Sequence, residues 1–424
     1  MVANENREGY KKTELGWIPE YWNVVELKSV CTEFNVPMRD KPKVFDGNVP
    51  WCRIEDIQGR YIYGTTSEQY VSAETITDMN LKINPKGSII CSCSASLGVV
   101  AMVENPLITN QTFIGIVLKD SICREYLYYY LLSCKQRFKR IAGGTTIPYI
   151  SREKFENFKI VYPSIMEQEK VGRILNTVDL TIEEIDKKLF ALTELKRALA
   201  KKLLSEGIGH EDFKDSEVGR IPLSWSIKDI SQISSSCNNG FVGTAAPFYT
   251  DEETGIPYMM GNNVRANRLD LRDRVFITKE FTDSNPRARI NTGDTLTVQS
   301  GHIGTTCVVP EEFNNAFCHA LIITKYKESV NSDYVAYYLN SDIGMKRLQN
   351  IFVGTTIKHI NTKDFVKFKI PIPDINEQIK ISNILKDFDK QISQYQQQKS
   401  DYTQLKAGLM QQLLTGKIRV KCDK

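Results

Sequence analysis

The sequence predicts an α+β protein with two tandem mixed α/β domains separated by two long helices, which pack on each other as an antiparallel coiled coil. Two observations predict this fold class. The chain repeats itself, and each copy passes from short β-rich runs to a long helical pattern. The predicted boundaries are 1–163 and 207–373 for the mixed domains, and 164–206 and 374–424 for the helical segments. Antiparallel pairing of the helices would relate the two halves by a pseudo-twofold axis.

The internal repeat extends over nearly the whole chain. Glu14–Pro19 returns as Glu217–Pro222, and in both copies a tryptophan follows three residues after the proline. Gly144–Glu206 aligns without gaps on Gly354–Gly416, and 24 of the 63 aligned positions are identical. Two unrelated chains of this composition would match at about 6% of positions. The sequence therefore contains one unit used twice.

The first part of each copy alternates short apolar runs with glycine, asparagine and proline breaks, which is typical of strands. Clear examples of such runs are Gly87–Cys91, Phe113–Leu118 and Ala320–Thr324. By contrast, Arg124–Ile141 and Ser332–Ile351 carry aromatic and aliphatic residues at helical spacing. Each copy is therefore expected to begin with a domain that mixes strands and helices.

The second part of each copy begins sharply. Ser164 and Asp374 each stand three residues before a glutamate and directly after a proline, which predicts an N-cap and a capping box. Apolar residues then recur at spacings of three and four, the coiled-coil pattern, with Lys196 interrupting the first series. Both patterns lack proline and end near Gly207 and Gly416. The apolar positions are Val178, Ile182, Ile185, Leu189, Leu192, Leu199 and Leu203, then Phe388, Ile392, Tyr395, Tyr402, Leu409 and Leu413.

The composition is that of an ordinary soluble protein, with 41% hydrophobic residues, 25% charged residues and a formal net charge of +4. The ten cysteines form no CxxC pair, which argues against a zinc ribbon or disulfide scaffold and favours reduced, mostly buried thiols in a cytoplasmic protein. The polar start argues against a signal peptide, and no stretch is long and apolar enough to span a membrane. The second helix would lead naturally back to the first domain, so we expect the two ends of the chain to lie close together.

Two doubled motifs connect the sequence with a known family. Ile160–Gln168 and Ile370–Gln378 each place a glutamate–glutamine pair inside a helix start, and the glycine–threonine loops Gly143–Ile147 and Gly354–Ile357 precede them. In these motifs, and in their doubled order along nearly the whole chain, the sequence resembles the specificity subunits of type I restriction-modification systems.

The resemblance implies a noncatalytic DNA-binding protein in which the mixed domains are target-recognition domains. Each domain would read one half of a bipartite site in double-stranded DNA, and the helices would set the spacer and dock two methyltransferase (M) subunits. Restriction/translocase (R) subunits are candidate further partners. S-adenosylmethionine, ATP and Mg²⁺ would be used by those partners, with no cofactor in this chain.

Clustered cations are the residues expected to contact a phosphate backbone. In each copy a cationic helix end leads into a glycine–threonine loop, and amides and hydroxyls of such a loop suit phosphate contact. The alternative in both copies is a solvated helix face that ends in a glycine C-cap. The candidates are Lys135, Arg137, Lys139, Arg140, Thr145 and Thr146 in the first copy, and Lys346, Arg347, Thr355, Thr356, Lys358 and His359 in the second.

Two polar turns, Ser92–Gly98 and Val298–Gly304, differ between the copies, as readers of two different half-sites should. Their candidate residues are Ser94, Gln299 and His302, whose side chains could hydrogen-bond to base edges. Arg53 and Asn262, in the loops 53–56 and 261–264, are candidates of the same kind. All these segments could equally be turns that shield the core.

Two other classes of protein remain as alternatives, a DNA-modifying enzyme in its own right and a coiled-coil scaffold. The enzyme is disfavoured because the sequence has no GxxxxGK[ST] loop, no glycine-rich adenosylmethionine loop and no credible nuclease carboxylate cluster. The four histidines are scattered without metal-ligand spacing. A pure scaffold would not need two large β-rich domains. We therefore predict no catalytic, cofactor-binding or metal-binding residue.

Overall fold

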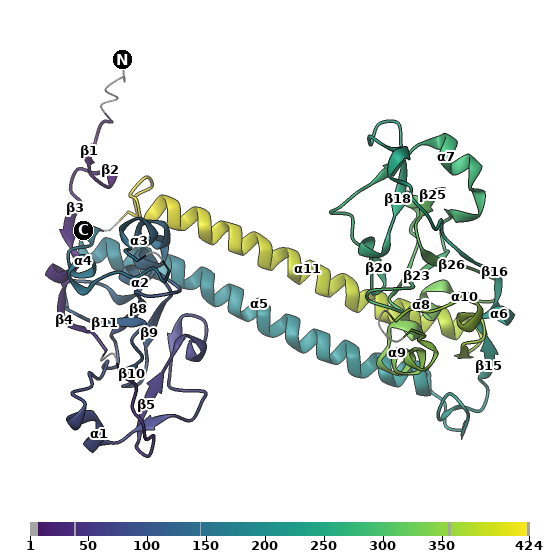
Figure 1. The fold of residues 1–424 in the computed structure, drawn as a ribbon, viewed down its shortest axis with the longest axis horizontal. Coiled ribbons are helices and arrows are strands. Elements are labelled where there is room, and N and C mark those ends of the chain that lie inside the picture. Colours follow the sequence, from purple (N-terminus) through teal and green to yellow (C-terminus); the bar gives the residue numbers. More distant parts are fainter. Residues whose placement is uncertain (1–6, 38–39, 145, 355–357, 422–424) are drawn as a thin grey trace. The chain divides into compact units, whose positions relative to one another are not determined.

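The computed structural model describes residues 7–37, 40–144, 146–354 and 358–421, and it divides into two compact units. Unit 1 comprises Met1–Asp186 and Gln397–Lys424, and unit 2 comprises Lys187–Gln396. Each unit contains one mixed domain and a stretch of both long helices, α5 (Ile165–Glu206) and α11 (Ile375–Leu413) (Figure 1). The division therefore falls within the helices, so each mixed domain belongs to the same compact body as the helix ends beside it.

Unit 1 is built on a five-stranded sheet and a three-stranded sheet. The apolar run predicted at 113–118 is the strand β11 with those bounds, and it pairs antiparallel with β8, Ile114 opposite Cys91. The five-stranded sheet has the order β4 (Cys31–Asn35), β11 (Phe113–Leu118), β8 (Ile89–Ser92), β9 (Val100–Val103) and β6 (Tyr61–Ile62), and the other has β10 (Ile108–Thr109), β5 (Val49–Cys52) and β7 (Tyr70–Val71). Two further pairs are β1 (Tyr10–Thr13) with β2 (Gly16–Pro19), and β3 (Asn23–Glu26) with β12 (Lys159–Tyr162).

The helical stretch predicted at 124–141 is two helices that meet at Cys134. The helices of the mixed domain are α1 (Ala73–Asp78), α2 (Arg124–Ser133), α3 (Lys135–Ile141) and α4 (Arg152–Glu156), with 3₁₀ turns η1 (Leu27–Val30) and η2 (Ile54–Asp56).

Unit 2 repeats this plan with a four-stranded and a five-stranded sheet. Their orders are β16 (Ser234–Asn239), β26 (Leu321–Tyr326), β23 (Thr295–Val298) and β24 (Thr306–Val308), and β17 (Tyr249–Thr250), β21 (Phe276–Ile277), β18 (Ile256–Met259), β25 (Ala316–Cys318) and β22 (Arg289–Ile290). The paired strands are β13 (Phe213–Lys214) with β14 (Ile221–Pro222), β15 (Ser226–Asp229) with β27 (Lys369–Ile372), and β19 (Val264–Arg265) with β20 (Arg268–Leu269).

The stretch predicted as helical at 332–351 is α8 (Ser332–Asn340), α9 (Asp342–Leu348) and η7 (Gln349–Ile351). The remaining helices of unit 2 are α6 (Ile230–Ile233), α7 (Lys279–Ser284) and α10 (Thr362–Phe365), with 3₁₀ turns η3 (Ala246–Phe248), η4 (Gly261–Asn263), η5 (Pro286–Ala288) and η6 (Glu311–Phe313).

The long helices pack antiparallel within each unit, as the sequence predicts. In unit 1, Asp179 pairs with Lys406 at 2.7 Å and Asp186 pairs with Lys399 at 2.6 Å, so the partner's number falls by seven as the first rises by seven. In unit 2, Lys196 pairs with Asp389 at 2.5 Å. Lys196, which interrupts the apolar series, therefore lies in the helix interface because a carboxylate of the other helix faces it.

The mixed domain of each unit packs on both helices through one apolar core. In unit 1 the core joins Trp22 to Val171 and Leu175 of α5 and to Leu413 of α11. In unit 2 the equivalent core joins Trp225 to Leu203 and Leu204 of α5 and to Ile381 and Leu385 of α11. In each unit, the same apolar core therefore stabilises both the mixed domain and the pairing of the two long helices.

The glutamate of the repeated Glu–Gln pair ties the helix start to the tryptophan of the repeat. The N-cap is confirmed in both copies, because Glu167 N donates to Ser164 Oγ at 3.3 Å and Glu377 N donates to an Asp374 carboxylate oxygen at 3.0 Å. The other half of the predicted capping box is wrong. The two glutamate carboxylates instead accept hydrogen bonds from the indole Nε1 of Trp22 and Trp225, both at 3.0 Å.

The glutamine of the pair fixes the start of the neighbouring helix in the mixed domain. Gln168 accepts from Cys123 N at 2.8 Å and donates to Pro163 O at 2.9 Å. Gln378 makes the same two bonds, accepting from Asn331 N and donating to Pro373 O, both at 2.9 Å. In both units, the Glu–Gln pair thus joins the start of a long helix to the tryptophan and to a helix of the mixed domain through the same hydrogen bonds.

A glycine follows the end of each long helix and lies against this tryptophan, directly after α5 and three residues after α11. Gly207 has φ +67°, and a Cβ there would overlap a Glu377 carboxylate oxygen and lie 2.8 Å from Trp225 Cζ2. Gly416 has φ +70°, and a Cβ there would overlap the ring of Pro19. Tyr10 Oη also donates to Gly416 O at 3.0 Å, which confirms that the beginning of the first domain lies beside the end of the second helix.

The nine cysteines among the described residues are free thiols, and seven of them are buried. Burial raises the pKa of Cys307 to about 12, so this thiol stays protonated. Among the helices of the described residues, none combines the length and the apolar character that a membrane crossing requires.

Candidate nucleic-acid interface

The polar turn, the basic helix and the glycine–threonine loop of the first copy lie together in unit 1. Ala95 N donates to Pro148 O at 3.0 Å and Ile150 N donates to Cys93 O at 2.8 Å, which joins the turn to the loop. The turn also packs on α3, since a Cβ on Gly98 would lie 3.3 Å from Lys135 Cα. We call the described residues of 92–98, 135–141 and 143–149 surface 1.

The same three elements lie together in unit 2. Ile360 N donates to Gln299 O at 3.0 Å, and Ser300 forms a β-bridge with His359. The turn packs on α9, because a Cβ on Gly304 would lie 3.3 Å from both Leu348 Cδ1 and Met345 Sδ. We call the described residues of 298–304, 342–348 and 353–359 surface 2. Two candidate segments that are about 50 residues apart in the sequence are therefore neighbours in both units.

Six of the predicted phosphate-binding residues, five cations and one threonine, are exposed to solvent. Lys135, Lys139 and Arg140 are exposed on α3, Lys346 is exposed on α9, and Lys358 is exposed in the loop of surface 2. Thr146 is exposed beside them, and His359 is half-buried. The remaining predicted residues of the two loops lie outside the described residues; they are Thr145, Thr355 and Thr356.

Arg137 and Arg347, two of the predicted phosphate-binding cations, have guanidinium groups that also hydrogen-bond within the fold. Arg137 donates to Tyr130 Oη at 3.2 Å and to Lys159 O at 2.7 Å, and it stacks over the ring of Phe158 at 4.3 Å. Arg347 repeats these contacts, donating to Tyr338 Oη and to Lys369 O at 2.7 Å and lying 4.9 Å from the ring of Phe368. Both arginines hold their helix on the strand that leads into a long helix.

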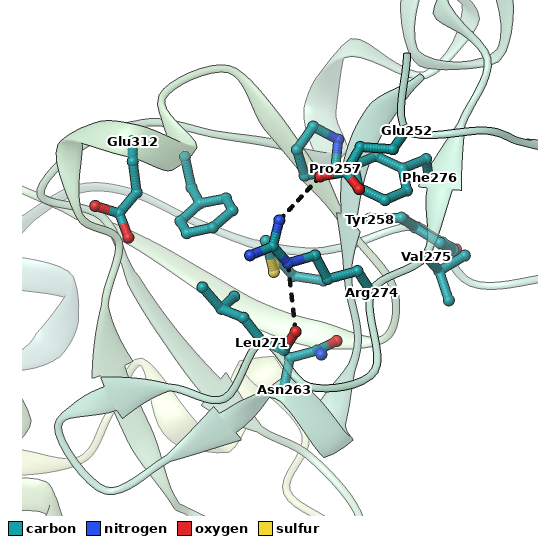
Figure 2. Close-up of a pocket in the computed structure, with 11 residues that line it drawn as sticks. Glu252, Pro257, Tyr258, Asn263, Leu271, Arg274, Val275, Phe276 and Glu312 are labelled. Carbon is teal, nitrogen blue, oxygen red and sulfur yellow. Dashed lines mark hydrogen bonds and ion pairs between the residues drawn. The ribbon is translucent and has the colours of Figure 1, made fainter. Parts of the chain in front are cut away.

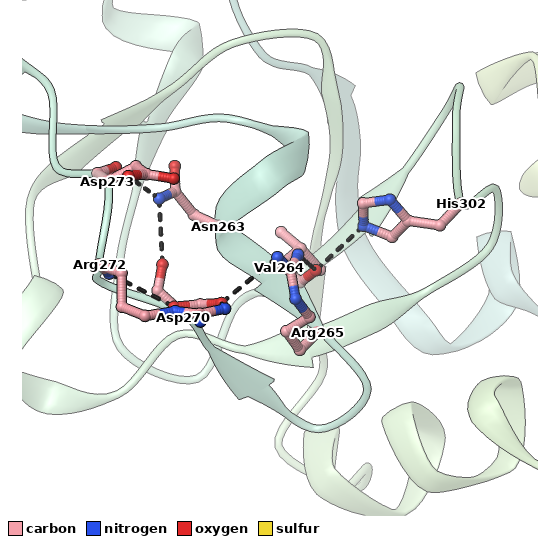
Figure 3. A network of polar contacts seen from close by, with 7 residues as sticks. All are labelled: Asn263, Val264, Arg265, Asp270, Arg272, Asp273 and His302. Atoms are coloured by element: carbon pink, nitrogen blue, oxygen red, sulfur yellow. Dashed lines mark hydrogen bonds and ion pairs between the residues drawn. The ribbon is translucent and has the colours of Figure 1, made fainter. Parts of the chain in front are cut away.

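The predicted residues of the turns are partly engaged by the fold. Gln299 donates to Asn239 Oδ1 at 3.2 Å and to Ile360 O at 3.3 Å, so its amide nitrogen positions the turn. Ser94 is half-buried and forms a β-bridge with Tyr149. His302 is exposed, and its Nε2 donates to Val264 O at 3.0 Å, toward the hairpin β19–β20 (Figure 3).

The loops that contain Arg53 and Asn262 are organised by their neighbours. Arg53 donates to the side chain of Gln69, and its own N donates to Asp56 Oδ2 at 2.7 Å. Asp56 and Asn263 are both 3% exposed, and Asn263 Oδ1 accepts from Met260 N at 2.9 Å, so they fix equivalent turns. Asn262 is exposed beside Asn263. The sequence pattern therefore pointed to the exposed Asn262, whereas the buried Asn263 is the residue that stabilises the turn.

Sequence reasoning also missed an arginine-rich segment of unit 2, Val264–Arg274, directly after η4. It contains four arginines in eleven residues, which a search for local charge clusters would have found. Asp270 lies among them with only 8% of its surface exposed. The guanidinium of Arg272, followed by that of Arg265, holds the pKa of the Asp270 carboxyl well below its usual range, so the cluster stays ionised.

A cavity of about 350 Å³ opens beside this segment and is lined by Tyr258, Phe276 and Phe313 among others (Figure 2). Arg274 also lines the cavity, and its guanidinium pairs with Glu252 at 2.9 Å and donates to Leu271 O at 3.3 Å. The ion pair with Glu252 therefore holds Arg274, the last residue of the arginine segment. Within the described part of the chain, no group of three or more histidine, cysteine, aspartate or glutamate residues is arranged to hold a metal ion.

Known proteins share this architecture. The chain is 30% identical to the putative type I restriction enzyme MjaX specificity subunit of Methanocaldococcus jannaschii, over 98% of this chain and 97% of that protein. It is 26% identical to the MjaVIII specificity subunit of the same organism with the same coverage of both chains. Its fold is similar to that of the type I restriction-modification S subunit from M. genitalium, with a TM-score of 0.59, 16% identity, and coverage of 95% and 97% of the two chains.

The family model described as the type I restriction modification DNA specificity domain matches twice, at residues 19–194 and 223–401. Each match contains most of one mixed domain, one of the two surfaces and part of one long helix. The chain belongs to the family of type I restriction-modification DNA specificity subunits.

Proposed function

We propose that surfaces 1 and 2 each read one half of a bipartite DNA target for a type I restriction-modification complex. The observation that carries this proposal is that both units join a polar turn, a helix with exposed cations and a glycine-rich loop into one surface. Contacts repeated in both units, such as those of Arg137 and Arg347, hold the basic helix in place, whereas the side chains of the neighbouring turns differ, Ser94 in one and Gln299 and His302 in the other. A common scaffold with different side chains suits an asymmetric target.

The chain acts in this proposal without catalytic residues of its own. Two methyltransferase subunits dock on the long helices and restriction/translocase subunits join them, with S-adenosylmethionine, ATP and Mg²⁺ bound by those partners. The similarity to specificity subunits over nearly the whole chain supports this assignment over a DNA-modifying enzyme or a pure scaffold.

Insertion of seven residues into α5 tests whether the helices set the spacer. The insertion adds two turns, or about 10 Å, and keeps the apolar face in phase. We expect methylome sequencing of a host that expresses the variant with its cognate methyltransferase to show both half-sites unchanged and a longer spacer. A matched insertion into α11 keeps the two helices equal in length. Altered half-sites, or an unchanged spacer in an active complex, would contradict the proposal.

Replacement of Lys135, Lys139 and Arg140 by alanine tests the phosphate role of surface 1. Each lost phosphate contact should reduce the slope of log affinity against log salt by about 0.9, so we expect a total reduction of about 3 and weaker binding to all sequences. Salt titrations of DNA binding by the assembled methyltransferase complex measure this slope. A variant lacking Lys43, Lys82 and Lys86, three exposed lysines of unit 1 outside surface 1, is the control. A changed recognition sequence, or an unchanged slope, would remove these residues from the phosphate contacts.

A further inference from the structure

The arginine segment Val264–Arg274 is held rigidly at the edge of surface 2. Asn263 Nδ2 donates to both Asp270 O at 3.1 Å and Asp273 O at 3.0 Å, and Asp270 N donates to Asn263 O at 2.6 Å. Leu269 and Leu271 pack against the apolar core of the unit. The backbone of the arginine segment is therefore held by hydrogen bonds from Asn263 and by the packing of Leu269 and Leu271.

The segment also contacts the turn and the helices of unit 2. His302 of surface 2 donates to Val264 O, and Asn267 N donates to Thr306 O at 2.9 Å. Asn340, the last residue of α8, donates to Asn267 Oδ1 at 2.7 Å. Figure 3 shows that His302 and Arg272 belong to one chain of polar contacts through Val264, Arg265 and Asp270. A nucleic acid that lies on the turn would therefore have this segment within its reach.

Arg272 is the exposed member of the cluster and is nevertheless held in one orientation. Its side chain is 82% exposed, whereas that of Asp270 is 8% exposed. Arg272 Nε donates to Asp270 Oδ1 at 2.9 Å and its Nη2 donates to Oδ2 at 2.5 Å, a bidentate pair. Arg265 approaches the same carboxylate, with Nη2 3.3 Å from Oδ2. One buried carboxylate therefore aims a guanidinium group that is otherwise surrounded by solvent.

The bidentate pair leaves one edge of the Arg272 guanidinium unused by Asp270. A guanidinium has five N–H donors, and the pair uses the Nε–H and one Nη2–H, so both N–H groups of Nη1 and one of Nη2 remain. Two parallel donors on one edge match the O6 and N7 acceptors of guanine in the major groove, which is the commonest specific arginine contact. Because the side chain is already oriented, less rotamer entropy is lost on binding.

We propose that Arg272, positioned by Asp270, reads a guanine in the half-site recognised by unit 2. The proposal rests on the proposed function and adds the base that one residue reads. The matching segment of unit 1 offers no such group, because its arginine, Arg60, is 4% exposed and bonds to Glu183 of α5 at 3.1 Å. The guanine contact is therefore specific to one half-site and leaves the other untouched.

Competition binding with the complex of this chain and its cognate methyltransferase subunits tests the proposal, using the methylated target with each base pair of the second half-site replaced in turn. Arg272→Ala should weaken binding to the intact target about 10- to 100-fold and abolish discrimination at one G·C pair only. Arg272→Lys keeps the charge but loses the fork, so discrimination at that pair should also be lost. Asp270→Asn should relax the same position without weakening binding to unrelated DNA. Arg287→Ala, an exposed arginine of unit 2 outside the segment, is the control.

Three results would overturn the inference. The second half-site could contain no G·C pair, the Arg272 variants could keep full discrimination at every position, or Arg272→Ala could weaken all sequences equally, which would assign Arg272 to a phosphate. Each of these leaves a wild-type complex that still binds a bipartite target. Loss of sequence preference in the wild type would instead refute the proposed function. Thermal unfolding of each variant separates a folding defect from a lost base contact.

Discussion

Replacement of Asp179 by alanine should lower the free energy of unfolding of unit 1 by about 3–5 kcal/mol, the range for breaking a buried ion pair by removing one partner. Asp179 is 6% exposed and lies where three elements meet. It accepts from Tyr129 Oη of α2 at 2.7 Å, pairs with Lys406 of α11 at 2.7 Å, and lies 3.9 Å from Arg60. Without the carboxylate, Lys406 and the Tyr129 hydroxyl lose their partner in a largely desolvated interface, whereas Arg60 keeps its pair with Glu183.

Hydrogen exchange across a denaturant series measures this loss in unit 1 separately from unit 2. Asp186→Ala is the matched control, because it removes another carboxylate of α5 whose pair with Lys399 is 47% and 42% exposed, and it should cost less than about 1 kcal/mol. Asp389→Ala, at the equivalent but 39% exposed position, should fall between the two. Equal losses for Asp179→Ala and Asp186→Ala would show that the buried cluster adds nothing beyond a surface pair.

The cluster around Asp179 has a counterpart in unit 2, which shows what the duplication preserves. Tyr337 Oη donates to Asp389 at 2.7 Å, and Lys196 pairs with Asp389 while lying 5.5 Å from the Tyr337 ring. Each cluster joins one helix of the mixed domain, α2 in unit 1 and α8 in unit 2, to both long helices. A tyrosine, an aspartate and a lysine therefore hold the mixed domain against both long helices in each unit.

The sequence predicted elements wherever one local pattern decides the structure. The strand at 113–118 and the N-caps Ser164 and Asp374 could be predicted from residues next to each other in the sequence. Antiparallel pairing followed from the duplication, and the ion pairs between the helices confirm it within each unit. Lys196 looked like a defect in the pattern because its partner, Asp389, is 193 residues away.

Side-chain roles were harder to predict because they depend on distant partners. Arg137 and Arg347 belong to basic runs in the sequence, yet each donates to a carbonyl 22 residues further along the chain. Glu167 and Glu377 were expected to accept a hydrogen bond from the backbone N–H of the N-cap residue. They accept from the indole N–H of a tryptophan instead, because this donor is buried and has no access to water. The internal repeat does not point to the arginine segment of unit 2, because the first copy has no equivalent run of arginines.

Replacement of Glu377 by alanine should destabilise unit 2 by about 1–3 kcal/mol, because the buried indole N–H of Trp225 would lose its acceptor. Glu377 is 8% exposed and accepts from Trp225 Nε1 at 3.0 Å and from Ile208 N and His210 Nε2 at 2.9 Å. The replacement therefore also removes the hydrogen bonds that hold Ile208 and His210, the residues that follow α5, against the start of α11.

A double-mutant cycle with Trp225→Phe isolates the indole bond of Glu377, because phenylalanine removes the donor together with its need for an acceptor. We expect a coupling energy of about 1–3 kcal/mol between the two sites, measured by hydrogen exchange in α5, α8 and α11 of unit 2. Glu211→Ala, an exposed glutamate next to His210, should change the stability by less than about 0.5 kcal/mol. A coupling near zero would mean that Glu377 stabilises the helix start only through its backbone, and the recurrence of Glu with Trp in both units would then need another cause.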